Sequence, residues 1–516
     1  MRRIHYADTR GLDPDAPLLS EVILRGQARG GGLYVPAELP LVDRSQLDAL
    51  ADLPYHQRVA RLMAWFGHDY DPDFIGRATR DAYGDQFRNR RISPVREVGA
   101  GEYLLELWHG PSCAFKDLAL QLMPALLSES AGRTDPQNGK AGDGERLIVV
   151  ATSGDTGKAA LEGFADRPHT RLAVLYPSAG VSELQRLQMV TQEGSNLAVF
   201  GVRGDFDTCQ EIARTLFADA TFREQLATRF SLGLSSANSI NWGRLLPQIA
   251  YYLSASADLV RSGVLSENGW IDFCVPTGNF GNILAAWYAR RLGAPIRRLI
   301  CACNENNVLH DFFQTGTYRV AGRELARTPS PSMDILVACN LERLLFELTG
   351  DPEAVRGWME ELIVHGSYEV GESLRSEMAG FLVSDWVSND ECLATIRETY
   401  SETGLLLDPH TAVARRVGHR LRTSDPLLVV GTAHWAKFGP DVLRALEGIG
   451  WDDPLPENLG SGHPDMILDA VRAHAPDQEV PEPLAGLADR PVRHRELLEG
   501  TVSAVGEALI GWMSGT

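Results

Sequence analysis

Long apolar segments are missing from this sequence of 516 residues. A helix that crosses a bilayer needs about 18 or more consecutive apolar residues, and no window of the sequence supplies them. The basic residues Arg2 and Arg3 are not followed by an apolar stretch, so the first residues do not match a secretory signal. We therefore predict a soluble, cytoplasmic protein without a membrane partner.

Positive charge is also scarce. The 49 lysines and arginines are outnumbered by 68 acidic residues, which gives a formal net charge of -19. So acidic a chain is not attracted in general to the phosphates of nucleic acid or to anionic lipid. We expect no nucleic-acid partner, and an anionic substrate would have to be captured by local groups.

Cysteine is sparse as well. The seven cysteines are scattered, odd in number and mostly set in apolar runs, which indicates reduced thiols rather than disulfides. In a strand, Cys301 and Cys303 would point to one face. No further Cys or His cluster lies near them in the sequence, so core packing is favoured over a metal site, and we predict no metal.

Strand and helix signals alternate from residue 147 onwards. Short apolar runs at 147–151, 172–176, 197–202, 271–275, 299–302 and 427–430 are typical of strands buried on both faces. Helical stretches separate them, one opening with a capping box from Ser182 to Gln185 and another at Asp205. This alternation predicts an α/β protein with doubly wound, mostly parallel sheets in two domains that face each other.

The length indicates two or three domains, at roughly 100–200 residues per domain. We expect an N-terminal accessory domain over residues 1–95, in which a glycine-rich turn leads into a short strand before Pro36. A large α/β domain would comprise 96–115 and 236–440, with a smaller α/β domain inserted at 116–235. The segment 441–516 carries no recognisable motif, and we expect a helical or irregular extension on the outside.

Three loops follow predicted parallel strands at their carboxyl ends, where open α/β sheets bind ligands. The first precedes a helix and combines two flexible glycines with hydroxyl donors, so it could hold a carboxylate at the helix N-terminus. An ordinary helix-capping turn is the alternative. This loop consists of Ser153, Gly154, Asp155, Thr156 and Gly157.

The second loop follows the strand at 271–275 and precedes another helical stretch. Two glycines before a helix N-terminus are typical of a phosphate cup built from backbone amides, although a plain glycine-rich turn is possible. The loop is neither a Walker loop nor a dinucleotide fingerprint. It consists of Gly278, Asn279, Phe280, Gly281 and Asn282.

Thr432 and Lys116 complete the set of candidates. The third loop, Gly431 to His434, follows the strand at 427–430, and its Thr432 hydroxyl could hydrogen-bond a heteroaromatic nitrogen or a structural partner. Lys116 stands between Phe115 and Leu118, and apolar surroundings lower the pKa of an amine and favour Schiff-base chemistry. A solvated surface lysine is the alternative.

Together these motifs resemble those of the threonine synthases, members of the fold-type II pyridoxal-phosphate enzymes related to the tryptophan synthase β chain. The resemblance rests on His-Gly-Pro-x-x-Ala-Phe-Lys-Asp at 109–117 and on the three loops in this order, and it extends to about Phe438. Segments 6–10, 31–36, 236–242 and 408–410 match the long form of this family. Two departures are Trp435, where the family commonly has Pro, and Ser112-Cys113, where it has Thr-Leu; both would touch the cofactor wall.

The resemblance implies a pyridoxal 5'-phosphate cofactor in Schiff-base linkage with Lys116. The 278–282 loop would hold the cofactor phosphate, Thr432 would face the pyridine nitrogen, and the 153–157 loop would hold the substrate carboxylate. Further candidates on the substrate side are Asn238, Ser239, Asn241 and Arg244.

The implied reaction is that of a carbon-oxygen lyase acting on phosphates, the last step of threonine biosynthesis. O-phospho-L-homoserine and water would give L-threonine and phosphate through γ-elimination and β-addition of water, in a monomer or homodimer. The alternatives are a phospho-lyase or a serine/threonine dehydratase of the same fold. A non-catalytic binding homologue is disfavoured because Lys116 and the glycine loops are intact.

Overall fold

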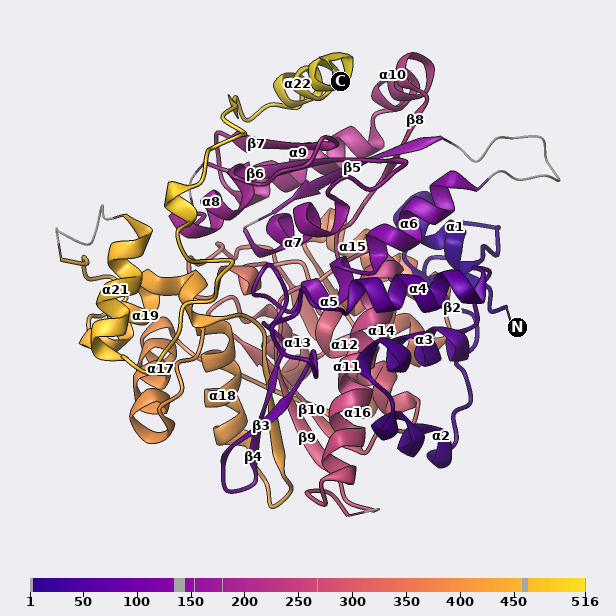
Figure 1. Ribbon diagram of the computed structural model, residues 1–516. Coiled ribbons are helices and arrows are strands. Elements are labelled where there is room, and N and C mark those ends of the chain that lie inside the picture. Colours follow the sequence, from indigo (N-terminus) through magenta and orange to yellow (C-terminus); the bar gives the residue numbers. More distant parts are fainter. Residues whose placement is uncertain are drawn as a thin grey trace.

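The computed structural model describes residues 3–133, 144–152, 154–178, 180–266, 268–456 and 463–515. Two sheets of mostly parallel strands, each covered by helices, organise this part of the chain (Figure 1). The predicted α/β architecture is therefore confirmed, and each of the six predicted strands is present with its ends shifted by at most a few residues.

The larger sheet has the strand order β13-β10-β9-β14-β4-β3. All its neighbouring strands run parallel except β3 and β4. Helices α11 and α12 lie on one side of this sheet and α18 on the other (Figure 1), which explains the uninterrupted apolar runs of its central strands. The strands are β3 (Val95–Gly99), β4 (Glu102–Glu106), β9 (Ile271–Pro276), β10 (Ile296–Cys303), β13 (Leu382–Trp386) and β14 (Leu427–Gly431).

The smaller sheet is parallel throughout, with the order β15-β7-β6-β5-β8. Its strands are β5 (Glu145–Ala151), β6 (Thr170–Pro177), β7 (Leu197–Val202), β8 (Leu232–Ser235) and β15 (Leu497–Leu498). Its helices are α7 (Asp155–Phe164), α8 (Glu183–Val190), α9 (Phe206–Ala218) and α10 (Ala220–Phe230).

Side-chain caps start two of these helices where the sequence predicts them. Asp205 accepts the Thr208 N–H at the start of α9, and Ser182 accepts the Gln185 N–H at the start of α8. Only half of the predicted capping box is formed, because Gln185 Oε1 accepts from the Ser182 hydroxyl and not from the Ser182 N–H. The Gln185 Nε2 group donates to Asp155. A residue in the first turn of α8 thereby contacts Asp155, which lines the cavity described below.

The N-terminal segment packs helices and a two-stranded sheet against the larger domain. Strands β1 (Tyr6–Asp8) and β2 (Tyr34–Pro36) pair in antiparallel fashion, and β2 is the short strand expected after the glycine-rich turn. The first helices are α1 (Leu19–Arg25), α2 (Arg44–Asp48), α3 (Tyr55–Phe66), α4 (Pro72–Ala82), α5 (Asp117–Leu120) and α6 (Met123–Gly132).

The other main elements follow β8 in the chain. They are α11 (Trp242–Arg261), α12 (Gly281–Arg291), α13 (Val308–Thr315), β11 (Thr317–Arg319), η3 (Pro331–Met333), α14 (Leu341–Thr349), α15 (Pro352–His365), β12 (Ser367–Glu369), α16 (Glu372–Ala379), α17 (Asn389–Thr403), α18 (Pro409–Leu421), η4 (Trp435–Phe438), α19 (Gly439–Glu447), α21 (Pro464–His474) and α22 (Val502–Gly515).

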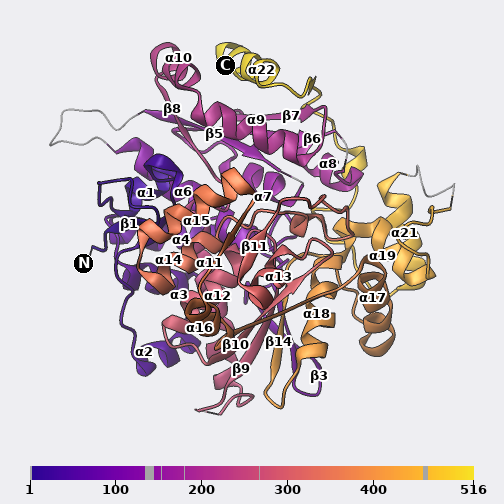
Figure 2. The ribbon, with the colours of Figure 1, turned by 180° about the vertical axis from the view of Figure 1, so that it is seen from behind.

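The C-terminal segment returns to the smaller sheet, which the sequence did not predict. Strand β15 pairs with β7, and α22 packs beside α9 (Figure 2). Val505, Leu509 and Met513 join the apolar core of the smaller sheet. The last described residues therefore complete the smaller domain, while α19 and α21 lie against the larger one (Figure 1).

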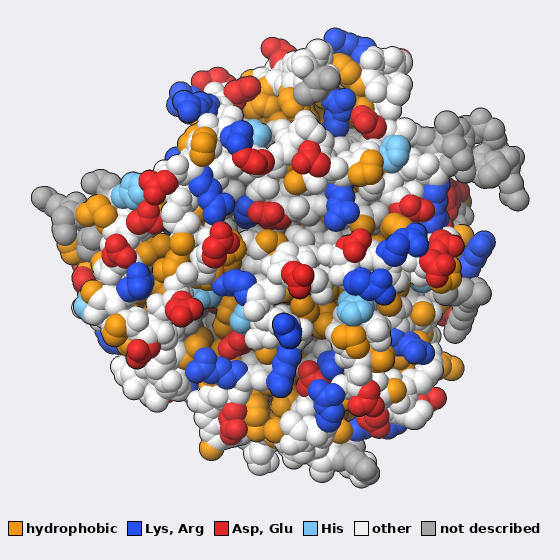
Figure 3. Space-filling view, in the orientation of Figure 1, with side chains coloured by type: hydrophobic (Ala, Val, Ile, Leu, Met, Phe, Trp, Pro, Cys, Tyr) orange, Lys and Arg blue, Asp and Glu red, His pale blue; other side chains and the backbone are white. Residues whose placement is uncertain are grey.

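The surface charges are mixed, and the cysteines are reduced as the sequence predicts. Acidic and basic side chains are interspersed over the face shown in Figure 3. The seven cysteines all lie in described ranges and are free thiols, with the sulfurs of Cys301 and Cys303 3.9 Å apart in the core. Among the described helices, none has the length and apolar character required to cross a membrane.

Candidate active site

A cavity of about 1320 Å³ lies where the carboxyl ends of both sheets meet. Residues that follow β5, β8, β9 and β14 line it, together with residues of the N-terminal segment. The loops at the strand ends therefore meet at one cavity, as the sequence predicts. The predicted site residues that line the cavity are Lys116, Asp155, Thr156, Asn238, Ser239, Arg244, Gly278, Asn279, Gly281, Asn282 and Thr432.

Four further predicted site residues lie in described ranges but do not line the cavity. Gly154 and Gly157 lie behind its wall and Phe280 is buried. The Asn241 side chain caps α11 through the Gly243 N–H and donates to the carbonyls of Ile23 and Ser236. Ser153 falls outside the described residues.

Backbone pairing sets the position of Lys116. The Phe115 N–H donates to the Thr432 carbonyl at 2.7 Å, and the His434 N–H donates to the Cys113 carbonyl at 3.0 Å. These bonds place Lys116 beside the end of β14, with its side chain buried in the cavity. Segments more than 300 residues apart in the sequence thereby bring Lys116 and Thr432 together.

The Lys116 amine faces one hydroxyl and one carboxylate. Its Nζ lies 3.1 Å from Ser332 Oγ and 3.8 Å from Asp155 Oδ2. Burial lowers the pKa of Lys116 to about 8; Asp155 opposes this change, and the positive charges of Arg244 and Lys437 add to it. The amine is therefore half neutral near pH 8, as a nucleophile or general base requires.

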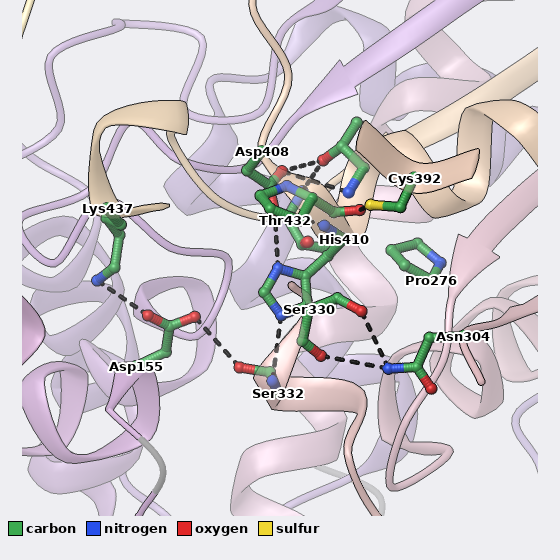
Figure 4. Close-up of polar contacts among 12 residues, drawn as sticks. Asp155, Pro276, Asn304, Ser330, Ser332, Cys392, Asp408, His410, Thr432 and Lys437 are labelled. Carbon is green, nitrogen blue, oxygen red and sulfur yellow. Dashed lines mark hydrogen bonds and ion pairs between the residues drawn. The ribbon is translucent and has the colours of Figure 1, made fainter. Parts of the chain in front are cut away.

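Three side chains besides Lys116 contact the Asp155 carboxylate. Lys437 Nζ lies 3.1 Å from Oδ1, and Ser332 Oγ lies 3.3 Å from Oδ2 (Figure 4). Oδ1 also accepts from Gln185 Nε2 at 3.0 Å. Burial alone would raise the pKa of Asp155, but Lys437 and then Lys116 overcome this effect and hold it below its ordinary value. The carboxylate therefore stays ionised beside the Lys116 amine.

His410 supports the same group of residues from the larger domain. Asp408 caps α18 and lies 2.8 Å from His410 Nδ1, and the Ser332 N–H donates to His410 Nε2 at 3.1 Å (Figure 4). Because Nε2 accepts a hydrogen bond, the ring proton sits on Nδ1 and is donated to Asp408.

The loop 278–282 forms the N-terminus of α12. Phe280 has a left-handed backbone with φ of 65° at the N-cap position, which turns the loop into the helix. A Cβ on Gly278 would lie only 2.7 Å from the Ser332 carbonyl oxygen, so only glycine fits there. The Asn282 amide holds the Pro276 carbonyl at 3.1 Å. The start of this 11-residue helix faces the cavity with backbone donors suited to a phosphate.

The loop at the start of α7 is partly occupied by its own side chains. Thr152 Oγ1 accepts the N–H groups of Gly154 at 3.0 Å and Gly157 at 2.9 Å. These two glycines shape the loop, since a Cβ on Gly157 would meet Thr152 Cγ2 at 2.6 Å. Thr156 remains at the cavity wall, so the donors open to an anion are at the first turn of the helix.

Of the arginines that line the cavity, Arg244 is the buried one. Arg10, Arg25 and Arg29 are more exposed, and each pairs with a carboxylate. Arg244 donates to the Ala237 carbonyl at 2.7 Å, but its buried Nε has no partner among the described residues. Burial lowers its pKa to about 10. A buried cation with an open donor at the cavity wall is suited to an anionic ligand.

Sequence reasoning did not identify Ser332, Lys437 or Gln185 as site residues. Ser332 has no local signal, because it follows no strand of either main sheet. Lys437 stands between Ala436 and Phe438, and an apolar setting of this kind is what singled out Lys116. The expectation that Cys113 and Trp435 touch the cofactor wall is not met, since neither lines the cavity.

Two known families match this chain. Residues 5–83 match the family described as Threonine synthase N terminus, and residues 88–385 match the one described as Pyridoxal-phosphate dependent enzyme. A threonine synthase of Pseudomonas aeruginosa is 38% identical over 462 residues, covering 88% of this chain and 93% of the relative. The human protein Threonine synthase-like 1 is 40% identical over 442 residues, 84% of this chain. The chain spans 58% of the length of that relative.

Solved structures give the same result. PLP-bound threonine synthase from Brucella melitensis is 34% identical, with a TM-score of 0.83 and 99% of both chains covered. Threonine synthase from yeast is 30% identical, with a TM-score of 0.84 and the same coverage. The likeness therefore includes the N-terminal segment and the C-terminal return to the smaller sheet.

Proposed function

This chain belongs to the threonine synthase family of fold-type II pyridoxal-phosphate-dependent enzymes, and on that premise we propose that it converts O-phospho-L-homoserine and water to L-threonine and phosphate. The observation that carries the proposal is the Lys116 amine, with its pKa lowered to about 8. It lies in one cavity with the N-terminus of α12 and the open donor of Arg244.

The residues present fit pyridoxal phosphate. Its phosphate suits the backbone amides at the start of α12. In the loop before this helix, position 278 has no room for a side chain. The Thr432 hydroxyl has no hydrogen-bond partner in the part of the chain that the structure describes, and it is suited to the ring nitrogen. When bound, the cofactor supplies an electron sink that makes the Cα proton of an amino acid removable.

The chain's own residues would bind the substrate at both ends. The first turn of α7, with Thr156, is suited to the α-carboxylate, and Arg244 offers a buried cation to the phosphate group. Asn238 and Ser239 line the same wall. Because Lys437 neutralises Asp155 at 3.1 Å, the loop before α7 does not repel an anion.

Lys116 would carry the acid-base work. Near pH 8 its neutral form can take the Cα proton, and the ammonium so formed can return a proton to another carbon. The position of the amine between the two sheets restricts water to what the cavity admits, which suits a reaction that adds a single water molecule. The cytoplasmic location and the monomeric or dimeric state stay predictions.

The test is the absorbance of the purified protein with pyridoxal phosphate, followed by identification of the products from O-phospho-L-homoserine. The wild type should show the visible band of lysine-bound cofactor, and Lys116→Ala should lose it. Lys158→Ala is the matched control, because Lys158 is also buried but pairs with Glu162 away from the cavity.

The products separate the alternatives. Threonine and phosphate would support the synthase, whereas 2-oxobutyrate would identify a phospho-lyase of the same fold. A cofactor-supplied wild type without a visible band would contradict the proposal as a whole.

A further inference from the structure

Ser332 connects the two domains at the Lys116 amine. It belongs to the short helix η3, which lies between β11 and α14, while Asp155 begins α7 of the smaller domain. Ser332 Oγ is 3.1 Å from Lys116 Nζ and 3.3 Å from Asp155 Oδ2. One hydroxyl therefore stands between an amine and a carboxylate that are 3.8 Å apart.

The charge of Asp155 fixes the direction of both hydrogen bonds. An ionised carboxylate can only accept, so the Ser332 hydroxyl donates its proton to Asp155 (Figure 4). The lone pairs of Ser332 Oγ are then left to accept an N–H from Lys116. A neutral amine held through one of its N–H groups keeps its own lone pair directed away from Ser332.

Both ends of this arrangement are anchored. Lys437 and Gln185 hold the far oxygen of Asp155 at 3.1 and 3.0 Å. On the other side, the Ser332 N–H donates to His410 Nε2 at 3.1 Å, and Asp408 holds His410 in the required tautomer. Neither the carboxylate nor the serine can turn away without breaking contacts that are buried.

We propose that Ser332 is a positioning residue that holds the neutral Lys116 amine by one N–H and so leaves its lone pair free to attack the cofactor and to accept the Cα proton. The inference rests on the proposed function, because it assumes that Lys116 reacts with pyridoxal phosphate. A lysine side chain has four rotatable bonds, and a small misplacement of a reacting group can cost about 100-fold in rate.

The test measures how fast the cofactor-free, full-length chain captures pyridoxal phosphate. The growth of the visible absorbance band reports the rate. Ser332→Ala should slow capture by roughly tenfold to 100-fold, and Ser332→Thr, which keeps a hydroxyl, should restore most of the rate. Ser330→Ala is the matched control. Ser330 is buried two residues away, and its hydroxyl contacts Asn304 and Thr328 instead of Lys116.

A second measurement follows the proton that Lys116 would take. The holoenzyme is incubated in D2O with 2-amino-5-phosphonopentanoate, in which a CH2 group replaces the ester oxygen so that phosphorus cannot leave. Deuterium incorporation at Cα should fall in Ser332→Ala by a factor similar to the capture rate, while the dissociation constant of the analogue changes less than about threefold, since the anion-binding groups are intact.

The outcomes are distinct. A wild type that forms no band overturns the proposed function and this inference with it. A normal wild-type band with equal capture rates for wild type and Ser332→Ala overturns the inference alone. It is also overturned if Ser330→Ala is slowed as much as Ser332→Ala, or if Ser332→Thr fails to recover, since the effect would then come from packing of the loop.

Discussion

Two groups of opposite charge type share the centre of the cavity, the Lys116 amine and the Asp155 carboxyl, 3.8 Å apart. Burial favours the neutral form of each. The fully buried Lys437 keeps Asp155 ionised, while Lys116 is half neutral near pH 8. The site thus presents one fixed negative charge and one amine that titrates in a useful range.

Removing the charge of Asp155 should move the pH dependence of cofactor capture. Asp155 raises the pKa of Lys116, whereas Arg244 and Lys437 lower it, so Asp155→Asn should bring that pKa below about 8. Since only the neutral amine attacks the cofactor, the rate should rise at lower pH than in the wild type. Asp272→Asn, which alters a buried acid paired with Arg298 away from the cavity, should leave the midpoint in place. A midpoint that stays or moves upward in Asp155→Asn would contradict this account.

Lys437 should be needed for stability because its loss strands a buried carboxylate. Lys437→Met should lower the free energy of unfolding by about 3–5 kcal/mol, measured by urea denaturation. The double variant with Asp155→Asn should recover part of the loss, because no buried charge is then unpaired. For comparison, Arg186→Met, at the exposed pair with Glu183, should cost about 0–1 kcal/mol. Additive losses in the double variant would refute the pairing.

At the scale of elements, the turn from β9 to α12 combines residues that look alike in the sequence but not in the structure. Gly278 packs against η3, where a Cβ would be 2.7 Å from the Ser332 carbonyl oxygen. At Gly281 the nearest atom to a Cβ would be Asn340 Nδ2 at 3.5 Å, an ordinary contact. Gly278 therefore allows the 278–282 loop to pack closely against η3, whereas Gly281 has no such close contact.

This difference predicts unequal effects of the same substitution. Gly278→Ala should displace η3 or the cup and weaken pyridoxal phosphate binding by about tenfold or more, which corresponds to about 1.4 kcal/mol. Gly281→Ala, at a helix N-terminus with room for a methyl group, should bind the cofactor within about threefold of the wild type. Titration of the cofactor-free protein with pyridoxal phosphate measures both, and equal affinities would contradict the steric argument.

At the scale of the whole molecule, the smaller domain is completed by the end of the described chain. Strand β15 extends the sheet at β7, and α22 adds Leu509, which is fully buried, to its core. The sheet that carries the start of α7, and with it Asp155, therefore depends on residues more than 340 positions later in the sequence.

Loss of this packing should destabilise the smaller sheet more than the larger one. Leu509→Ala should destabilise the protein by about 2–5 kcal/mol and reduce amide hydrogen-exchange protection in β7 and β6 before β9 and β14. Met466→Ala, at a half-exposed position of α21, should stay within about 0.5 kcal/mol of the wild type. Uniform loss of protection in both sheets would mean that the domains unfold as one unit.

Much of the fold and half of the site are encoded locally. Apolar runs buried on both faces predicted the strands, Ser182 and Asp205 predicted helix starts, and glycines before helices predicted the two loops. The apolar neighbours of Lys116 indicated its lowered pKa. Each of these signals lies within a few residues, where backbone geometry and side-chain burial follow from the sequence itself.

Tertiary structure alone decided which polar atoms meet. Ser332 reaches Lys116 across 216 positions, and Lys437 reaches Asp155 across a still longer separation, so no local pattern could pair them. Packing also determined which donors are already used, as with the two glycine amides bound to Thr152. Burial strengthens such contacts by removing water, and burial depends on the whole chain. The sequence by itself determined the class of chemistry, and the tertiary structure decided how the Lys116 amine is held.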